Sequence, residues 1–203
     1  GGRLSAEAVD QFLETGDAAT SQGWTAFVLD TNGNGRRDQY VEPGQPIDPT
    51  KDTRITAGYY GIGVSPVDGS IWGSVLGFPG AVIRLNPGEN PPATALTEVF
   101  DVPWNDPTAA VNGYGPRGMD IDRSGVVWVP LASGHLASFD RRRCTVLNGP
   151  TATGKHCPQG WSLHPLPGPQ FQGVTDPGSA QASYYTWVDQ HNTFGLGRNV
   201  PFA

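Results

Sequence analysis

An internal repeat constrains this chain more than any other feature of its sequence. One stretch starts at Gly61 and reads GIGVSPVDGSIW, and another starts at Gly118 and reads GMDIDRSGVVW. With Val67 treated as one inserted residue, three further pairs align: Gly69 with Gly125, Ile71 with Val127 and Trp72 with Trp128. A glycine turn between β-branched and aromatic residues is typical of short antiparallel strands. Repetition of such a unit after a few tens of residues is typical of propeller blades.

Each repeat is followed by residues that favour two more strands. Third strands are predicted at 81–86 and 136–140, and fourth, outer strands at 97–102 and 161–166. Each copy is therefore expected to form one four-stranded blade.

A hairpin predicted near the N-terminus has a connection rich in oxygen-bearing side chains. It reads DTNGNGRRD, with oxygen ligands at alternate positions and glycines that let the backbone curl, as a hard cation such as Ca²⁺ requires. The expected ligands are the side chains of Asp30, Asn32, Asn34 and Asp38 and the backbone carbonyl of Arg36. The loop departs from an EF-hand because its twelfth position is Val41, and Glu42 lies one residue further on. The alternative is a polar hairpin turn that binds no metal.

The segments on either side of the blades complete the expected organisation. Ser5 can cap a short helix over 6–13 that stops at Gly16, and the hairpin would pair a strand at 24–29 with one around 39–41. The chain is expected to be all-β, a partial β-propeller of about two complete four-stranded blades with flanking strands and one short N-terminal helix. This single domain over 1–203 would divide into the helix and calcium-loop hairpin at 1–54, blades at 55–104 and 116–167, and the start of a further blade at 182–203.

The composition suits a β-rich chain with many turns, since its 203 residues include 28 glycines and 19 prolines. The net charge of −6 argues against a nucleic-acid partner, because binding a polyanion requires a patch of Lys and Arg. The one basic run, Arg141–Arg143, is better explained as a solvated turn. No apolar run approaches the roughly 20 residues of a membrane span.

Cys144 and Cys157 are the only cysteines of the chain. A disulfide between them is favoured, two free thiols are the alternative, and a metal site is not favoured because only His156 adjoins them. A disulfide would place the protein outside the cytoplasm. The first residues lack the charged and apolar segments of a signal peptide, so we expect either that one was removed or that the chain belongs to a longer polypeptide.

With Val67 left out as the inserted residue, the two repeats share the pattern GxxxxxxGxxW. They resemble the blades of streptogramin lyase (virginiamycin B lyase-like) propellers, and NHL-type and lactonase-like propellers share the pattern. Longer segments resemble the propeller portion of large exported bacterial proteins described as streptogramin lyase-like: GWTAFVLDTNGNGRRDQYVEP, GSVLGFPGAVIRLNPG, PRGMDIDRSGVVWVPLASGHLASFDRRRC and ASYYTWVDQHNTFGLG. In that family the propeller often accompanies a carboxypeptidase-regulatory-like domain and a c-type haem segment.

Two features of the family have no counterpart in this chain. Streptogramin lyases hold Mg²⁺ with a histidine pair and a glutamate in the central opening, and that set cannot be matched to positions here. The Cys-x-x-Cys-His haem motif is absent, because Cys144 and Cys157 are too far apart and no His follows Cys157. Any c-type haem is therefore expected on another segment or partner.

Blade geometry places the residue before each inner strand at the central channel. These residues are Tyr60, Arg117 and, by analogy with the repeats, Tyr185. An arginine between two tyrosines suits an anionic or aromatic ligand, and packing at the channel mouth is the alternative. His135 and His191 are the candidate catalytic residues, as bases or metal ligands, against the alternative of histidines with no chemical role.

Two complete blades cannot close a propeller, which needs at least about four. The remainder of a larger polypeptide, or other chains, is therefore expected to complete it. The favoured function is a non-catalytic scaffold or binding platform, stabilised by calcium, in a periplasmic or extracellular assembly. A lyase-like or lactonase-like enzyme with a divalent metal in the channel is the alternative. A partner surface in a redox complex is a third hypothesis.

Overall fold

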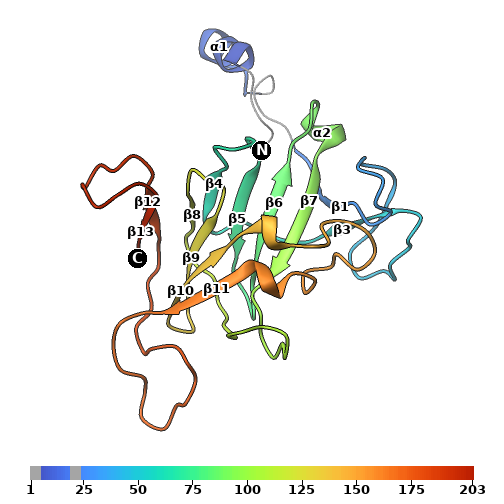
Figure 1. Ribbon diagram of the computed structural model, residues 1–203. Coiled ribbons are helices and arrows are strands. Elements are labelled where there is room, and N and C mark those ends of the chain that lie inside the picture. Colours follow the sequence, from blue (N-terminus) through green and yellow to red (C-terminus); the bar gives the residue numbers. More distant parts are fainter. Residues whose placement is uncertain (1–5, 19–23) are drawn as a thin grey trace.

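The computed structural model describes residues 6–18 and 24–203 of the chain, and over these ranges the protein is all-β with one short N-terminal helix (Figure 1). Helix α1 spans Ala6–Thr15 and ends, as predicted, before Gly16, whose φ of 70° suits a glycine. The predicted cap, Ser5, lies outside the described residues. No described helix is both long and apolar enough to cross a membrane.

Seven strands form the larger sheet, in the order β2-β3-β1-β7-β6-β5-β4. Four consecutive strands make an antiparallel meander: β4 (Ile62–Val64), β5 (Ile71–Val75), β6 (Ala81–Asn86) and β7 (Leu96–Asp101). The other three extend its outer edge: β1 (Phe27–Leu29), β2 (Tyr40–Val41) and β3 (Asp52–Ile55). β1 runs parallel to β7, with Leu29 opposite Thr97. The N-terminal strands and the first repeat therefore share one sheet.

The second repeat forms a separate four-stranded antiparallel meander: β8 (Asp120–Ile121), β9 (Val127–Leu131), β10 (His135–Phe139) and β11 (Trp161–Pro165). The turns between the first two strands of each repeat contain Gly69 and Gly125, with φ of 69° and 81°. These positive angles favour glycine, which explains why both repeats keep one there. The predicted third and fourth strands of both repeats are confirmed. A hairpin of β12 (Trp187–Asp189) and β13 (Val200–Phe202) follows.

The predicted hairpin between residues 24–29 and 39–41 is wrong. β3 lies between β1 and β2, and Tyr40 of β2 is paired in parallel with Asp52 of β3. β3 takes the central place because it pairs with all three residues of β1, whereas β2 has only two residues to offer. The oxygen-rich loop therefore connects strands that are not neighbours.

The two meanders pack face to face, and their contact forms the main core. The ring of Phe139 on β10 lies 4.5 Å from that of Phe100 on β7 and 6.1 Å from that of Trp72 on β5. Trp161 on β11 lies 5.0 Å from Phe139, and all four side chains are buried. Because alternate residues of a strand point to one face, the period-two pattern of the repeats places these rings together.

The two repeats differ in what covers their shared tryptophan. Trp72 is 2% exposed because the second meander covers it, whereas Trp128 is only half-buried. Trp128 is paired with Ser138 on the face of the second meander that is turned away from the first. This face, which we call the open face, has only partial cover.

The segment between β10 and β11, residues 140–160, crosses to the outer side of the first meander (Figure 1). The predicted disulfide between Cys144 and Cys157 is confirmed and closes this segment. The N–H of Asp101 at the end of β7 donates to the carbonyl of Gly154 within it, at 3.0 Å. The segment, which we call the disulfide segment, thus links the two meanders, and its Cys157 packs into their common core.

Short helical turns begin and end this segment and interrupt one other connection: η2 (Arg141–Arg143), η3 (Pro158–Gly160) and α2 (Pro91–Thr94). The predicted solvated turn at Arg141–Arg143 is wrong for Arg141, because its guanidinium pairs with the carboxylate of Glu98 on β7. Arg142 and Arg143 are exposed, as expected.

Candidate functional site

The inner edges of the two meanders lie side by side and bring the repeat glycines close to the next segment. A Cβ atom on Gly61 would lie 2.6 Å from the backbone nitrogen of Met119, and one on Gly118 would lie 2.0 Å from the ring of Tyr185. The N–H of Gly118 also donates to the carbonyl of Tyr184 at 2.8 Å. Each repeat glycine therefore allows the following inner segment to approach, and the same relation occurs twice.

Four side chains gather at this inner edge, and we call them the inner-edge cluster: Tyr60, Arg117, Tyr184 and Tyr185. The rings of Tyr60 and Tyr185 stack with centroids 5.8 Å apart and planes 22° apart. The guanidinium carbon of Arg117 lies 5.4 Å from the ring centroid of Tyr184. The three predicted ligand-binding residues are thus brought together. Tyr184 was missed because only one residue per inner strand was assigned to the channel.

Arg117 is the charged member of the inner-edge cluster. A hydrogen bond with Tyr185 raises the pKa of the Tyr60 hydroxyl above its usual value, desolvation acts in the same direction, and the charge of Arg117 opposes both. Tyr60 is therefore neutral at pH 7. Tyr184 and Tyr185 are each 63% exposed. The cluster thus offers accessible ring faces beside one cation, which suits a flat ligand with negative charge.

The predicted calcium loop is folded around its first carboxylate. Oδ1 of Asp30 accepts a hydrogen bond from the N–H of Asn34 at 3.0 Å, and Oδ2 accepts one from the N–H of Gly35 at 2.9 Å. The side-chain amides of Asn32 and Asn34 donate to Oδ2 of Asp38 at 3.1 and 2.6 Å. The four predicted side-chain ligands therefore share one hydrogen-bonded loop.

The donor set of this loop is mainly amide and carbonyl oxygen. No group of three or more His, Cys, Asp or Glu side chains in the described part of the chain is arranged to hold a metal ion. A cation in the loop would therefore depend also on Asn side chains and on a backbone carbonyl such as that of Arg36. The hydrogen bonds from Asn34 and Asn32 hold the pKa of Asp38 below its usual value, so Asp38 is ionised at neutral pH.

The two candidate catalytic histidines lie at opposite ends of the second meander. His135 follows the β9–β10 turn, is 1% exposed, and its Nδ1 lies 3.0 Å from Oγ of Ser133. His191 is exposed, and its Nδ1 lies 3.2 Å from Nη1 of Arg123, in the β8–β9 turn. Because these turns lie at the two ends of β9, His135 and His191 do not form one site.

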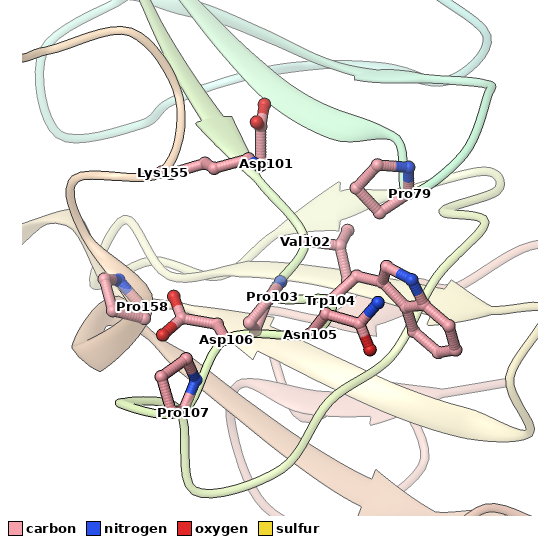
Figure 2. Close-up of a pocket in the computed structure, with 10 residues that line it drawn as sticks. All are labelled: Pro79, Asp101, Val102, Pro103, Trp104, Asn105, Asp106, Pro107, Lys155 and Pro158. Atoms are coloured by element: carbon pink, nitrogen blue, oxygen red, sulfur yellow. The ribbon is translucent and has the colours of Figure 1, made fainter.

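A cleft that the sequence did not predict lies where β7 leads into the second meander (Figure 2). Its volume is about 310 Å³, and its lining residues are Pro79, Asp101, Val102, Pro103, Trp104, Asn105, Asp106, Pro107, Lys155 and Pro158. Burial raises the pKa of Asp101, and the charge of Lys155 opposes this. Figure 2 shows Lys155 reaching towards Asp101, while Asp106 lies apart from them beside Pro107. The two carboxylates therefore do not form an acid-base pair.

Comparison of the chain with protein-family models, with curated proteins and with solved structures finds no match. The resemblance to streptogramin lyase-like propellers therefore stays a prediction.

One buried histidine, His135, and one half-buried histidine, His156, predict a pH-dependent stability. Burial lowers the pKa of His135 and of His156 below its usual value, and Nε2 of each has no hydrogen-bond partner. The unfolded chain then binds protons more readily than the folded one, so stability is full above about pH 6.5 and falls as the pH drops below it. Each histidine contributes a slope of at most about 1.4 kcal/mol per pH unit. Urea unfolding between pH 8 and 5 measures this.

The control for this pH dependence is His191, which is exposed in the connection between β12 and β13. The variant His191→Gln should keep the wild-type profile, whereas the double variant His135→Gln/His156→Gln should have a flatter one. An unchanged slope in the double variant would contradict the assignment.

Proposed function

We propose that this chain is a non-catalytic binding module of the β-propeller type, which binds its ligand at the inner-edge cluster. The observation that carries the proposal is the repeated contact along the inner edge, where Gly61 meets Met119 and Gly118 meets Tyr185. A propeller is built by repeating one such contact around an axis. The residues before the inner strands would then face the channel, where ligands of concave sites bind.

The open face supports a larger assembly. In the first repeat the tryptophan is covered by the next meander, and in the second repeat Trp128 has no equivalent cover within the described residues. A further blade, from the rest of a longer polypeptide or from another chain, would cover it as the second meander covers Trp72.

The proposed setting is periplasmic or extracellular, with Ca²⁺ bound by the oxygen-rich loop as a structural ion. The disulfide supports an oxidising compartment, where such bonds persist. Free Ca²⁺ outside the cytoplasm is high enough to fill loops of modest affinity, which two loop carboxylates would give. Its role would be to stabilise the outer edge of the first meander, since the loop lies between β1 and β2.

The proposed ligand class is an anionic aromatic compound. Arg117 would hold the anion, and the exposed rings of Tyr184 and Tyr185 would stack on the flat part of the ligand. No observation favours the enzyme alternative, because His135 and His191 lie apart and His135 is buried.

The test is a titration with 4-hydroxybenzoate and with its neutral amide, followed by chemical-shift changes at the cluster. A compound of this size should bind with a Kd of about 1 mM, with the acid favoured over the amide. Arg117→Gln should weaken binding of the acid about tenfold and leave the amide unchanged. The matched control is Arg123→Gln, an exposed arginine in the β8–β9 turn. Absence of binding, or equal losses in both variants, would refute the proposed site.

A further inference from the structure

A buried carboxylate without a full set of partners lies next to the oxygen-rich loop. Asp52, the first residue of β3, is 0% exposed, and its Oδ1 accepts no hydrogen bond. Its Oδ2 accepts one from the N–H of Asp38 at 2.7 Å. A buried charged oxygen without a partner is costly unless a cation or a proton neutralises it. Asp52 therefore marks a place where a cation or a proton is needed.

Strand pairing brings Asp52 to the loop from outside it. β3 is antiparallel to β1, with Thr53 opposite Leu29, and parallel to β2, with Asp52 opposite Tyr40. Asp52 consequently lies between the two ends of the loop, next to Asp30 at its start and Asp38 at its end. The separation of 14 residues from Asp38 hides this relation in the sequence.

Two other carboxylates, those of Asp30 and Asp38, lie near enough to Asp52 for their charges to act on it. Burial raises the pKa of Asp52, backbone N–H groups of Asp38 and Thr31 oppose this, and the negative charges of Asp30 and Asp38 act in the same direction as burial. Asp30 is itself buried and is held by N–H donors from Asn34 and Gly35. A divalent cation would replace this mutual repulsion with attraction.

We propose that Asp52 is a direct Ca²⁺ ligand and supplies the acidic side chain that the loop lacks at its twelfth position, an inference that rests on the proposed calcium loop. The loop itself ends in Val41, and the carboxylate of Glu42 is already paired with Nη1 of Arg54 at 2.8 Å. Asp52 is a nearby acid whose Oδ1 has no hydrogen-bond partner. The ligand set is then Asp30, Asn32, Asn34, the Arg36 carbonyl, Asp38 and Asp52, all oxygen, as Ca²⁺ requires.

This assignment gives the ion a position that joins three parts of the fold. The loop follows β1, and Asp52 begins β3. Asp30 also accepts hydrogen bonds from Nδ2 of Asn148, to its Oδ2 at 3.0 Å, and from the N–H of Gly149, to its carbonyl at 2.8 Å. Bound Ca²⁺ would therefore tie β1, β3 and the disulfide segment together.

The test is calorimetric titration of the whole 203-residue chain with CaCl₂, together with thermal unfolding in CaCl₂ and in EDTA. The wild type should bind one Ca²⁺ per chain, and its unfolding midpoint should rise by about 5 °C or more at 100 times the Kd. Asp52→Asn should weaken binding about tenfold or more. In EDTA the same variant should unfold at the wild-type temperature or above it, because a repelled buried charge has been removed.

Two variants separate the possible failures. Glu42→Gln, which removes an acid that adjoins the loop in sequence, should bind Ca²⁺ as the wild type does, and Asp30→Asn should not bind it. If Asp30→Asn loses Ca²⁺ while Asp52→Asn keeps wild-type affinity, the loop binds calcium without Asp52 and this inference is wrong. If the wild type binds none, the calcium loop fails as well, while ligand binding at the inner-edge cluster is judged by its own titration. Equal destabilisation of Asp52→Asn in EDTA and in CaCl₂ would assign Asp52 a purely structural role and overturn the inference.

Discussion

Replacing Phe139 with alanine should lower the free energy of unfolding by about 3–5 kcal/mol, the usual loss when a fully buried phenylalanine is truncated. Phe139 is 0% exposed and contacts the rings of Phe100, Trp72 and Trp161 from both meanders. A cavity there would remove contacts on both sides of the interface at once. Equilibrium urea unfolding, with circular dichroism to confirm that the variant folds, measures the loss.

The control for Phe139 is Phe171, which is 68% exposed and should tolerate alanine within about 0.5 kcal/mol. The repeat offers a second comparison, since Trp72→Ala should cost far more than Trp128→Ala in this chain. Similar losses for Trp72 and Trp128 would show that the open face is packed in solution. A small loss for Phe139→Ala would show that the two meanders do not share a core.

Most of the fold could be predicted from the repeat, because the residues that set its strands and turns lie close together in the sequence. Turn glycines such as Gly125 and alternating apolar residues such as Val127 and Val129 set strand length and direction within about 20 residues, so both meanders could be predicted. The face-to-face core follows from the same alternation. The inner-edge cluster was reached by the same route, because Tyr60 and Arg117 occupy equivalent places before equivalent strands.

The errors and omissions involve partners that are distant in sequence. β3 displaced β2 from β1 because it makes the longer pairing, and no local pattern distinguishes the two short strands. The same displacement brought Asp52 to the oxygen-rich loop. Arg141 looked like part of a solvated turn because its partner, Glu98, lies in the other meander. In each case tertiary contact, rather than propensity, decided the outcome.

Removing the disulfide should cost about 3 kcal/mol, the second large effect expected in this chain. The bond closes a loop with a sequence separation of 13 residues, and cross-linking a loop of that length removes conformational entropy from the unfolded chain. Cys157 is buried in the core cluster beside Phe139 and Trp161. The double variant Cys144→Ser/Cys157→Ala, compared with the wild type by urea unfolding, measures the effect.

Removing the disulfide should also affect the oxygen-rich loop. The disulfide segment carries Asn148 and Gly149, which donate hydrogen bonds to Asp30 in the oxygen-rich loop, so loosening it should also weaken the proposed Ca²⁺ binding. Dithiothreitol should reproduce both effects in the wild type and leave the double variant unchanged. A reduced chain as stable as the oxidised one would remove the argument for an oxidising compartment, because the fold would then gain nothing from the bond. A destabilised chain with undiminished Ca²⁺ affinity would instead show that the loop and β3 hold the ion without the disulfide segment.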